Sequence, residues 1–140
     1  MLAKELMKRD VECVSSTDTV RTAAARMRDA NVGFLPVCDD SGKALGTLTD
    51  RDIAIRLVAE DRPASEPVEQ VMTRGVVACR PEEDLRVVQE RMGAEQKSRI
   101  ICTDDDGRPL GVISLSDIAE HEEAGRAAQT MREVTRREAA

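Results

Sequence analysis

Aromatic residues are almost missing from this sequence. Among its 140 residues there is no tryptophan and no tyrosine, and Phe34 is the only phenylalanine. Proteins that bind single-stranded nucleic acid stack the bases on aromatic side chains, so this mode of binding has almost nothing to work with here. The interior must be built from valine, leucine, isoleucine, alanine and methionine.

Histidine is equally scarce, and this limits the catalytic chemistry. The single histidine, His121, lies among glutamates, without a serine or cysteine nucleophile pattern or metal-ligand spacing around it. Aspartates cluster at 39–40 and 104–106, but the alternation of an EF-hand loop is missing and hairpin turns favour aspartate. We therefore expect a protein that is not an enzyme, holds no metal and requires no cofactor.

Long apolar runs and concentrated positive charge are also lacking. The net charge is -6 and the basic residues are scattered among acidic ones, so no footprint for duplex DNA or RNA is present. No stretch is long and apolar enough to span a bilayer, and the N-terminus has no apolar run of signal-peptide length. We expect a cytoplasmic protein that binds neither nucleic acid nor membranes.

The four cysteines, Cys13, Cys38, Cys79 and Cys102, lie far apart without a CxxC pair, which disfavours a zinc ribbon or a thioredoxin-type site. All four fall in predicted strands, where a free cysteine serves as a small buried hydrophobe. Cys13 and Cys38 are expected on neighbouring strands, and so are Cys79 and Cys102. A disulfide in either pair is the alternative, although a reducing compartment disfavours it.

An internal duplication with an offset of 65 positions organises the chain. Residues 46–52, GTLTDRD, return as residues 111–117, GVISLSD, and the same offset aligns Gly42 with Gly107 without a gap. A chain of this length buries about two thirds of its unfolded surface. The two half-size repeats must therefore share a core.

The hydrophobic pattern predicts the order strand, helix, strand, strand, helix in each repeat. In the first repeat we expect strands at 11–14, 34–38 and 44–49, a helix ending near residue 30 with capping side chains at 15–18, and a helix from Asp50 to Val58. In the second we expect strands at 76–79, 99–102 and 110–114, and helices at 81–92 and from Leu115. Short helical lead-ins are expected at 2–8 and 68–72.

This order predicts an α+β (mixed α/β) fold in which each half forms a small mixed sheet with a parallel crossover. Residues 1–62 form the first repeat and 68–124 the second, and the linker 63–67 contains two prolines that stop the preceding helix. Because neither half covers both faces of its sheet, we expect the repeats to pack as a pseudo-two-fold pair.

Residues 125–140 are expected to form a charged C-terminal helical tail. Along the last helix, from about Ser116 into this tail, apolar side chains recur at helical spacing and include Ala124, Ala127, Ala128, Met131 and Val134. Two interpretations stay open. The tail is either a weak apolar stripe for a partner or a second copy of the chain, or a frayed and solvated charged helix.

The duplicated motifs resemble those of a tandem pair of CBS domains, the module named after cystathionine β-synthase. The resemblance extends from Leu6 to about Glu122. It is carried by the string 34–37 with an acidic turn after it, and by residues 46–52 and 111–117, which match the family's pattern of glycine, two apolar or small residues, threonine or serine, two variable residues and aspartate.

The resemblance implies two clefts between the repeats, which in many members bind AMP, ADP, ATP, NAD or S-adenosylmethionine. The motif aspartate would accept bonds from both ribose hydroxyls, which suits a carboxylate. One cleft would contain Asp117, Ser114, Ser116, Val112 and Arg99, with Val32, Gly33 and Phe34 from the other repeat. The second would contain Asp52, Thr49, Thr47 and Arg51, with Val77, Lys97 and Ser98 opposite.

Individual roles also follow from the resemblance. Val112 would lie against the base and Ser116 near a phosphate. Arg99 resembles a phosphate-contacting arginine in the γ subunit of AMP-activated protein kinase, whose final repeat has the same string as Ser114–Ile118. A structural alternative needs no ligand, because an aspartate in the first turn of a helix satisfies N–H groups and the helix dipole by itself.

We therefore expect a non-catalytic regulatory or sensor module that binds an adenosine-containing ligand, an adenine nucleotide above all. The resemblance further implies a homodimer, and an unidentified protein partner would receive the signal. The alternative function is a dimeric interaction or scaffold protein without a ligand, acting through its surface and its C-terminal helix.

Overall fold

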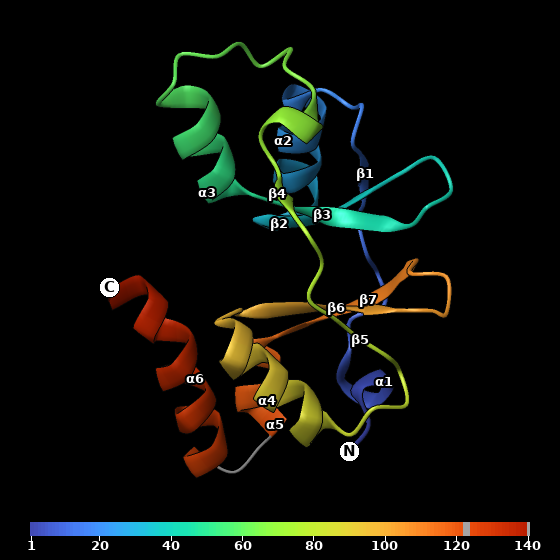
Figure 1. Ribbon diagram of the computed structural model, residues 1–140, viewed down its shortest axis with the longest axis vertical. Helices are drawn as coiled ribbons and strands as arrows, with labels where there is room; N and C mark the ends of the chain where they lie inside the picture. Colours follow the sequence, from blue (N-terminus) through green and yellow to red (C-terminus); the bar gives the residue numbers. More distant parts are fainter. Residues whose placement is uncertain (122–123, 140) are drawn as a thin grey trace. The chain divides into compact units, whose positions relative to one another are not determined.

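The computed structural model describes residues 1–121 and 124–139, which form two compact units (Figure 1). Unit 1 contains residues 1–10, 77–105 and 109–140, and unit 2 contains residues 11–76 and 106–108. Each unit holds one sheet with its helices, so the expected α+β class is confirmed. The first ten residues belong to the unit of the second repeat.

Unit 2 contains a four-stranded sheet in the order β1-β2-β3-β4. Strands β1 and β2 are parallel, and β2–β3 and β3–β4 are antiparallel. Its elements are β1 (Val14–Ser15), α2 (Val20–Ala30), β2 (Phe34–Cys38), β3 (Ala44–Thr49), α3 (Asp50–Asp52), the π-helix η1 (Ile53–Val58), the 3₁₀-helix η2 (Val68–Gln70) and β4 (Thr73–Arg74).

Unit 1 contains a three-stranded sheet in the order β5-β6-β7, with β5 parallel to β6 and β6 antiparallel to β7. The expected parallel crossover is therefore confirmed in both repeats. The elements of unit 1 are α1 (Ala3–Leu6), β5 (Ala78–Cys79), α4 (Leu85–Glu95), β6 (Arg99–Thr103), β7 (Pro109–Ser114), α5 (Leu115–His121) and α6 (Ala124–Ala139). Helices α4 and α5 lie on one side of this sheet, and α6 packs against these two helices (Figure 1).

The helix caps repeat with the offset of the sequence. The C-terminal caps of helices α2 and α4 are Asn31 and Gln96, which both adopt left-handed backbone conformations with φ of 55° and 54°. At the start of α2, Thr19 Oγ1 accepts a hydrogen bond from Thr22 N at 3.1 Å. The prediction that a residue within 15–18 caps this helix is therefore wrong. The cap is Thr19, because α2 begins at Val20 and the N-cap residue immediately precedes the helix.

Each unit has its own aliphatic core, and the lead-in segments supply part of it. The core of unit 1 comprises Ala3, Leu6, Met7, Cys79, Leu85, Val88, Met92, Ile100, Cys102, Ile113 and Ile118. The core of unit 2 comprises Val14, Val20, Ala23, Met27, Leu35, Val37, Leu48, Leu57, Val68, Val71 and Met72. Each lead-in thus packs with the other repeat: residues 1–10 belong to unit 1, which contains the second repeat, and residues 68–74 belong to unit 2, which contains the first. We call this arrangement the exchange of the lead-ins.

Several predicted boundaries are wrong because each lead-in pairs with the sheet of the other repeat. The lead-in at 2–8 is helical only over Ala3–Leu6, because Lys8 N and Val112 O form a bridge at 3.0 Å to the edge of β7. The strand expected at 11–14 is Val14–Ser15, and the one expected at 76–79 is Ala78–Cys79. Thr73 and Arg74 form β4 on the sheet of unit 2 instead.

The exchange explains why the repeated motif begins with glycine. A Cβ on Gly46 would lie 2.2 Å from Thr73 O, and one on Gly111 would lie 2.9 Å from Lys8 O. Any side chain would therefore collide with the backbone of the exchanged lead-in. The motif glycines permit a close backbone approach in both units.

Helix α6 packs on its own unit. Val134 and Thr130 are buried, whereas Met131 is 48% exposed. Gly93 of α4 lies against Glu133 of α6, with its ideal Cβ position 3.4 Å from Glu133 Cβ. The expected apolar stripe is therefore split: Val134 faces the chain itself, Met131 and Ala128 are exposed, and the side chains of Ala124 and Ala127 lie outside the described residues.

All four cysteines are free. Cys79 and Cys102 are register partners on β5 and β6, as expected, but Cys13 precedes β1 instead of lying in a strand. Within the described part of the chain, no helix combines the length and apolar character needed to cross a membrane.

Candidate ligand-binding site

In unit 1, the residues at the end of the motif form a closed hydrogen-bond ring at the start of α5. Asp117 Oδ2 accepts a bond from Ser114 N at 3.0 Å, and Ser114 Oγ accepts one from Asp117 N at 3.2 Å. Ser116 Oγ lies 2.8 Å from Ser114 Oγ. This is a capping box with aspartate in the reciprocal position, so the carboxylate and hydroxyl groups are fixed before any ligand arrives.

The second oxygen of Asp117 faces a cation from the exchanged lead-in. Lys8 Nζ lies 3.2 Å from Asp117 Oδ1, with the Asp117 side chain only 9% exposed. Burial raises the pKa of Asp117, but hydrogen bonds with Ser114 and the Lys8 ammonium outweigh this effect and hold the pKa below its usual value. Asp117 is therefore ionised at neutral pH and can only accept hydrogen bonds.

Unit 2 repeats this arrangement around Asp52. Asp52 Oδ2 accepts a bond from Thr49 N at 3.0 Å, and Thr49 Oγ1 accepts one from Asp52 N at 3.1 Å. Thr73 Oγ1 donates to Asp52 Oδ1 at 3.3 Å, and Arg56 Nε lies 3.9 Å from the same oxygen. A neutral hydroxyl thus occupies the place that the Lys8 ammonium occupies in unit 1.

In each unit, the strand before the motif strand, β6 in unit 1 and β2 in unit 2, places a side chain beside the motif hydroxyl residue. Arg99 pairs in register with Ser114, and Phe34 pairs with Thr49. In each unit a backbone hydrogen bond also joins the first residue of the helix after the motif strand to the residue before the neighbouring strand. Leu115 N donates to Ser98 O at 2.8 Å, and Asp50 N donates to Gly33 O at 3.0 Å.

The predicted site residues are thus divided between the units. Unit 1 holds Val77, Lys97, Ser98, Arg99, Val112, Ser114, Ser116 and Asp117, and unit 2 holds Val32, Gly33, Phe34, Thr47, Thr49, Arg51 and Asp52. The grouping of Asp117 with Val32, Gly33 and Phe34, and of Asp52 with Val77, Lys97 and Ser98, draws on both units and stays a prediction.

Sequence reasoning missed Lys8 and Thr73. The offset of 65 aligns these two residues with each other, just as it aligns Asp52 with Asp117. That signal marks them as equivalent, but it does not indicate that each contacts the motif of the other repeat. Only the exchange of the lead-ins brings Lys8 to Asp117 and Thr73 to Asp52.

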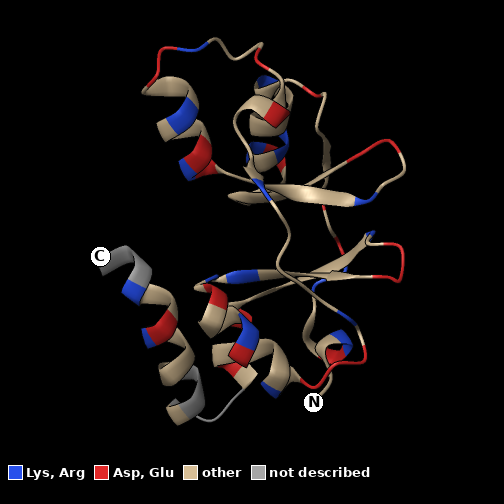
Figure 2. Cartoon of the chain, viewed as in Figure 1, with Lys and Arg blue, Asp and Glu red and all other residues tan. Residues whose placement is uncertain are grey.

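In the first acidic hairpin turn, Asp39 holds the turn through its own hydrogen bonds. Figure 2 shows acidic residues at both turns. Asp39 Oδ1 accepts bonds from Ser41 N at 2.9 Å, Ser41 Oγ at 2.7 Å and Lys43 N at 3.0 Å. Bonds from Ser41 and Lys43 hold the pKa of Asp39 below its usual value. Over residues 1–121 and 124–139, no group of three or more histidine, cysteine or acidic side chains is placed to hold a metal ion.

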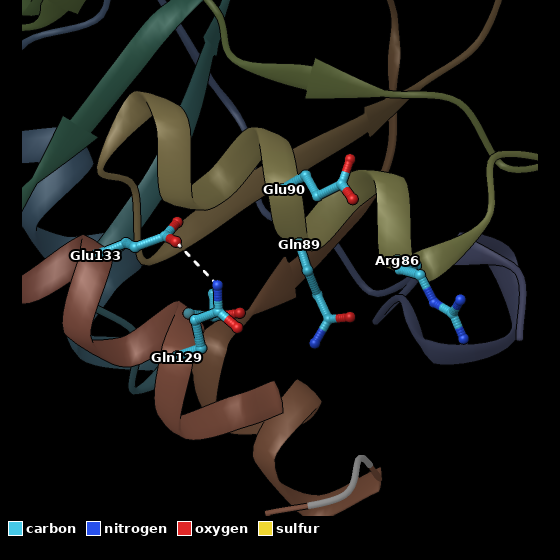
Figure 3. Close-up of a pocket in the computed structure, with 6 residues that line it drawn as sticks. Arg86, Gln89, Glu90, Gln129 and Glu133 are labelled. Atoms are coloured by element: carbon cyan, nitrogen blue, oxygen red, sulfur yellow. Dashed lines mark hydrogen bonds between the residues drawn. The ribbon is translucent and has the colours of Figure 1, made fainter. Parts of the chain in front are cut away.

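A polar pocket of about 200 Å³ lies between α4 and α6 (Figure 3). It is lined by Arg86, Gln89, Glu90, Gln129, Thr130 and Glu133, none of which is a predicted site residue. Gln129 Nε2 donates to Glu133 Oε1 at 3.5 Å, the dashed line in Figure 3. Ligand pockets usually measure about 300–1,000 Å³, so this one suits water better than a nucleotide.

The same order of elements and the same aspartate hydrogen-bond ring occur in both units, so the chain consists of two related α+β modules. Comparison with known proteins identifies their family. The family model for the CBS domain matches residues 3–59 and again residues 68–124. The chain therefore belongs to the CBS domain family and carries two copies of the domain.

Relatives agree with this assignment. Uncharacterized protein YlbB of Bacillus subtilis is 34% identical over 140 aligned residues, covering 96% of this chain and 94% of that protein. The 5′-AMP-activated protein kinase subunit gamma-3 of Homo sapiens is 33% identical over 120 residues, covering 80% of this chain and 24% of that protein. The CBS domain pair of protein MJ0100, solved with 5′-methylthioadenosine and S-adenosyl-L-methionine, has a TM-score of 0.77 at 27% identity, covering 86% of this chain and 94% of that one.

Proposed function

We propose that this chain is a non-catalytic regulatory module that binds an adenosine-containing ligand at Asp117. The observation that carries the proposal is the combination of charge, burial and fixed position of the Asp117 carboxylate. It is ionised, nearly buried and held in place by Ser114 before a ligand binds. Such an acceptor is prepared for a pair of vicinal hydroxyls, which ribose supplies.

Each neighbouring side chain has a role in this proposal. Asp117 Oδ1, now 3.2 Å from the Lys8 ammonium, accepts the ribose hydroxyls. The hydroxyls of Ser114 and Ser116, 2.8 Å apart, contact ribose or phosphate. Arg99, exposed and in register with Ser114, reaches a phosphate from the adjacent strand. Asp52 with Thr47, Thr49 and Arg51 forms the corresponding second site.

The relatives support the ligand class. MJ0100 was solved with two adenosine derivatives bound, and the matched kinase subunit belongs to an enzyme activated by 5′-AMP. The adenine contacts from Val32, Gly33 and Phe34 belong to the same proposal. We further propose that the chain acts as a cytoplasmic homodimer, in which ligand binding favours one of two states and so signals to a protein partner.

A thermal-shift screen against AMP, ADP, ATP, NAD and S-adenosylmethionine tests this function. A ligand that binds only the folded state raises the melting temperature with its concentration. Calorimetric titration of Asp117→Ala should then show affinity weaker by about 1.5–3 kcal/mol, the contribution of hydrogen bonds to a charged group. Glu120→Ala, which removes an exposed carboxylate from the same helix, is the matched control and should bind normally.

Because Asp117 also caps α5, the fold of each variant is checked by circular dichroism. Asp117→Asn retains an oxygen for the Ser114 N–H and provides a second, better-folded variant. No melting shift with any compound at millimolar concentration would refute ligand binding and favour the ligand-free dimeric scaffold.

A further inference from the structure

We propose that Lys8 makes the Asp117 site selective for a nucleoside that carries a 5′-phosphate. The inference rests on the proposed function and names the ligand class of that same site. Lys8 lies outside the repeated motif, and its ammonium reaches the motif aspartate only through the exchange of the lead-ins.

The backbone fixes where Lys8 lies. Lys8 N donates to Val112 O and Val112 N donates to Lys8 O, both at 3.0 Å. Gly111 allows this approach, because a Cβ there would lie 2.9 Å from Lys8 O. Lys8 is therefore an antiparallel partner of Val112 at the free edge of β7, rather than a residue of a loose N-terminal arm.

Two cations consequently flank the motif strand from opposite sides. Lys8 pairs with Val112 on one edge of β7, and Arg99 pairs with Ser114 across β6 on the other. Val112 and Ser114 alternate with buried Ile113, so they point to the face opposite the core, and directly paired residues share a face. Lys8, Ser114 and Arg99 therefore project from one face of the sheet.

The Lys8 ammonium can serve a second acceptor. Its side chain is 76% exposed, and the ion pair at 3.2 Å to Asp117 Oδ1 occupies one of its three donors. In this proposal the 5′ substituent of a ribose bound through Asp117 lies within reach of the Lys8 ammonium, which a flexible four-carbon stem carries. A phosphate there gains a charge-assisted bond from Lys8, whereas the sulfonium of S-adenosylmethionine meets like charge.

Unit 2 provides an internal comparison. Thr73 occupies the position equivalent to Lys8 and offers Asp52 a neutral hydroxyl at 3.3 Å. The cation nearest Asp52 is Arg56, whose Nη1 already donates to Val71 O at 3.2 Å and Met72 O at 2.8 Å. Arg56 is thus tied to the backbone, and the selectivity we assign to Lys8 has no counterpart at the same position in unit 2.

Calorimetric titration of the full chain with AMP and with adenosine tests the inference. The variants are Lys8→Thr, which copies the residue of unit 2, and Lys8→Arg, which keeps the charge. Wild type should bind AMP more tightly than adenosine, and Lys8→Thr should weaken AMP binding about tenfold with adenosine binding unchanged. Lys8→Arg should retain most of the preference. The AMP affinity of wild type should also fall more steeply with salt than that of Lys8→Thr.

The outcomes separate the two proposals. Suppose that wild type binds AMP, and that Lys8→Thr either weakens the affinities for AMP and for adenosine equally or changes neither affinity. Lys8 then has only a structural role, and this inference is wrong while the proposed function stands. If wild type binds adenosine as tightly as AMP, the selectivity is likewise refuted. Binding of neither compound would overturn this inference, whereas the proposed function would be overturned only if ADP, ATP, NAD and S-adenosylmethionine also failed to bind in the thermal-shift screen.

Discussion

Gly46 lies directly against the carbonyl of Thr73, and a Cβ on residue 46 would stand 2.2 Å from Thr73 O. The atom in the way is backbone in a sheet, where Thr73 pairs with Thr47 and Arg74 pairs with Gly46. It cannot move aside without breaking the pairing of β3 with β4. The motif glycine therefore holds the exchanged lead-in and brings Thr73 to Asp52.

The contact predicts the effect of Gly46→Ala. This variant should lower the free energy of unfolding by about 1–3 kcal/mol, the usual cost of overpacking, when measured by urea denaturation. Gly125→Ala is the matched control, because none of the atoms that the structure describes lies within 4 Å of its ideal Cβ and its φ is not positive. That variant, in helix α6, should be neutral or gain about 0.5–1 kcal/mol. Equal stability of Gly46→Ala and wild type would contradict the exchanged pairing.

Asp117 should make stability depend on pH. Its folded-state pKa is lowered, so the ionised carboxylate stabilises the fold above the unfolded pKa of about 4, and this contribution is lost as the pH falls through the folded pKa. Asp117→Asn cannot ionise. The difference in unfolding free energy between wild type and Asp117→Asn should be largest near pH 7 and narrow below about pH 4.

Lys8→Met provides the second arm of the pH experiment. Without the ammonium the carboxylate loses one cause of its lowered pKa. The contribution of Asp117 to the pH dependence of the unfolding free energy should therefore be smaller in Lys8→Met than in wild type. A difference between wild type and Asp117→Asn that stays constant from pH 7 to pH 3 would show that the charge of Asp117 does not contribute.

Cys13 should be the first cysteine to react in the folded protein. A hydrogen bond with the Cys38 thiol lowers the pKa of Cys13 despite its partial burial, and the pKa of Cys102 is lowered by Cys79 in the same way. Cys102, however, is 0% exposed. Because reactivity needs both a thiolate and access, a short iodoacetamide pulse followed by mass spectrometry should label Cys13 and spare Cys102.

Unfolding in urea removes the protection and is the control, since all four free cysteines should then be labelled. Labelling of Cys102 as fast as Cys13 without denaturant would mean that the sheet of unit 1 opens readily around β6.

Gln89 predicts a stabilising substitution. The residue is 3% exposed, and among the described residues neither amide atom of its side chain has a hydrogen-bond partner. Gln89→Met keeps the length of the side chain and removes the desolvated amide, so thermal unfolding should show a gain of about 1 kcal/mol. Val88→Ala, at the neighbouring buried position, should instead destabilise. A loss of stability in Gln89→Met would indicate that ordered water in the α4–α6 pocket satisfies the amide.

The order of elements could be predicted because it depends on local patterns. Strands β2 and β3 follow from the apolar run at 34–38 and the turn after it, and the duplication carries the same assignment to β6 and β7. Helical spacing also predicted the helix after Asp50. It did not predict that Ile53–Val58 is a π-helix, because side-chain spacing does not specify whether Ala59 N donates to Ala54 O, as it does at 3.0 Å.

The candidate site was predicted in part. The repeated motif identified Asp52 and Asp117, and their capping bonds follow from the residue types. Lys8 and Thr73 could not be found in this way, because a polar residue before a short strand carries no periodic signal. Their contacts depend on pairing between segments far apart in the sequence, which local propensity does not encode.

A titration of ¹⁵N-labelled protein with AMP, followed by two-dimensional NMR, tests the central claim most directly. If AMP binds at Asp117, the amide signals of Lys8, Arg99 and residues 112–117 should shift together and saturate with one dissociation constant. In Asp117→Ala, the same signals should need about 10- to 150-fold more AMP, which corresponds to the expected loss of about 1.5–3 kcal/mol. Signals of these residues that stay in place at millimolar AMP, with shifts confined to the α4–α6 pocket or seen nowhere, would contradict a nucleotide site at Asp117.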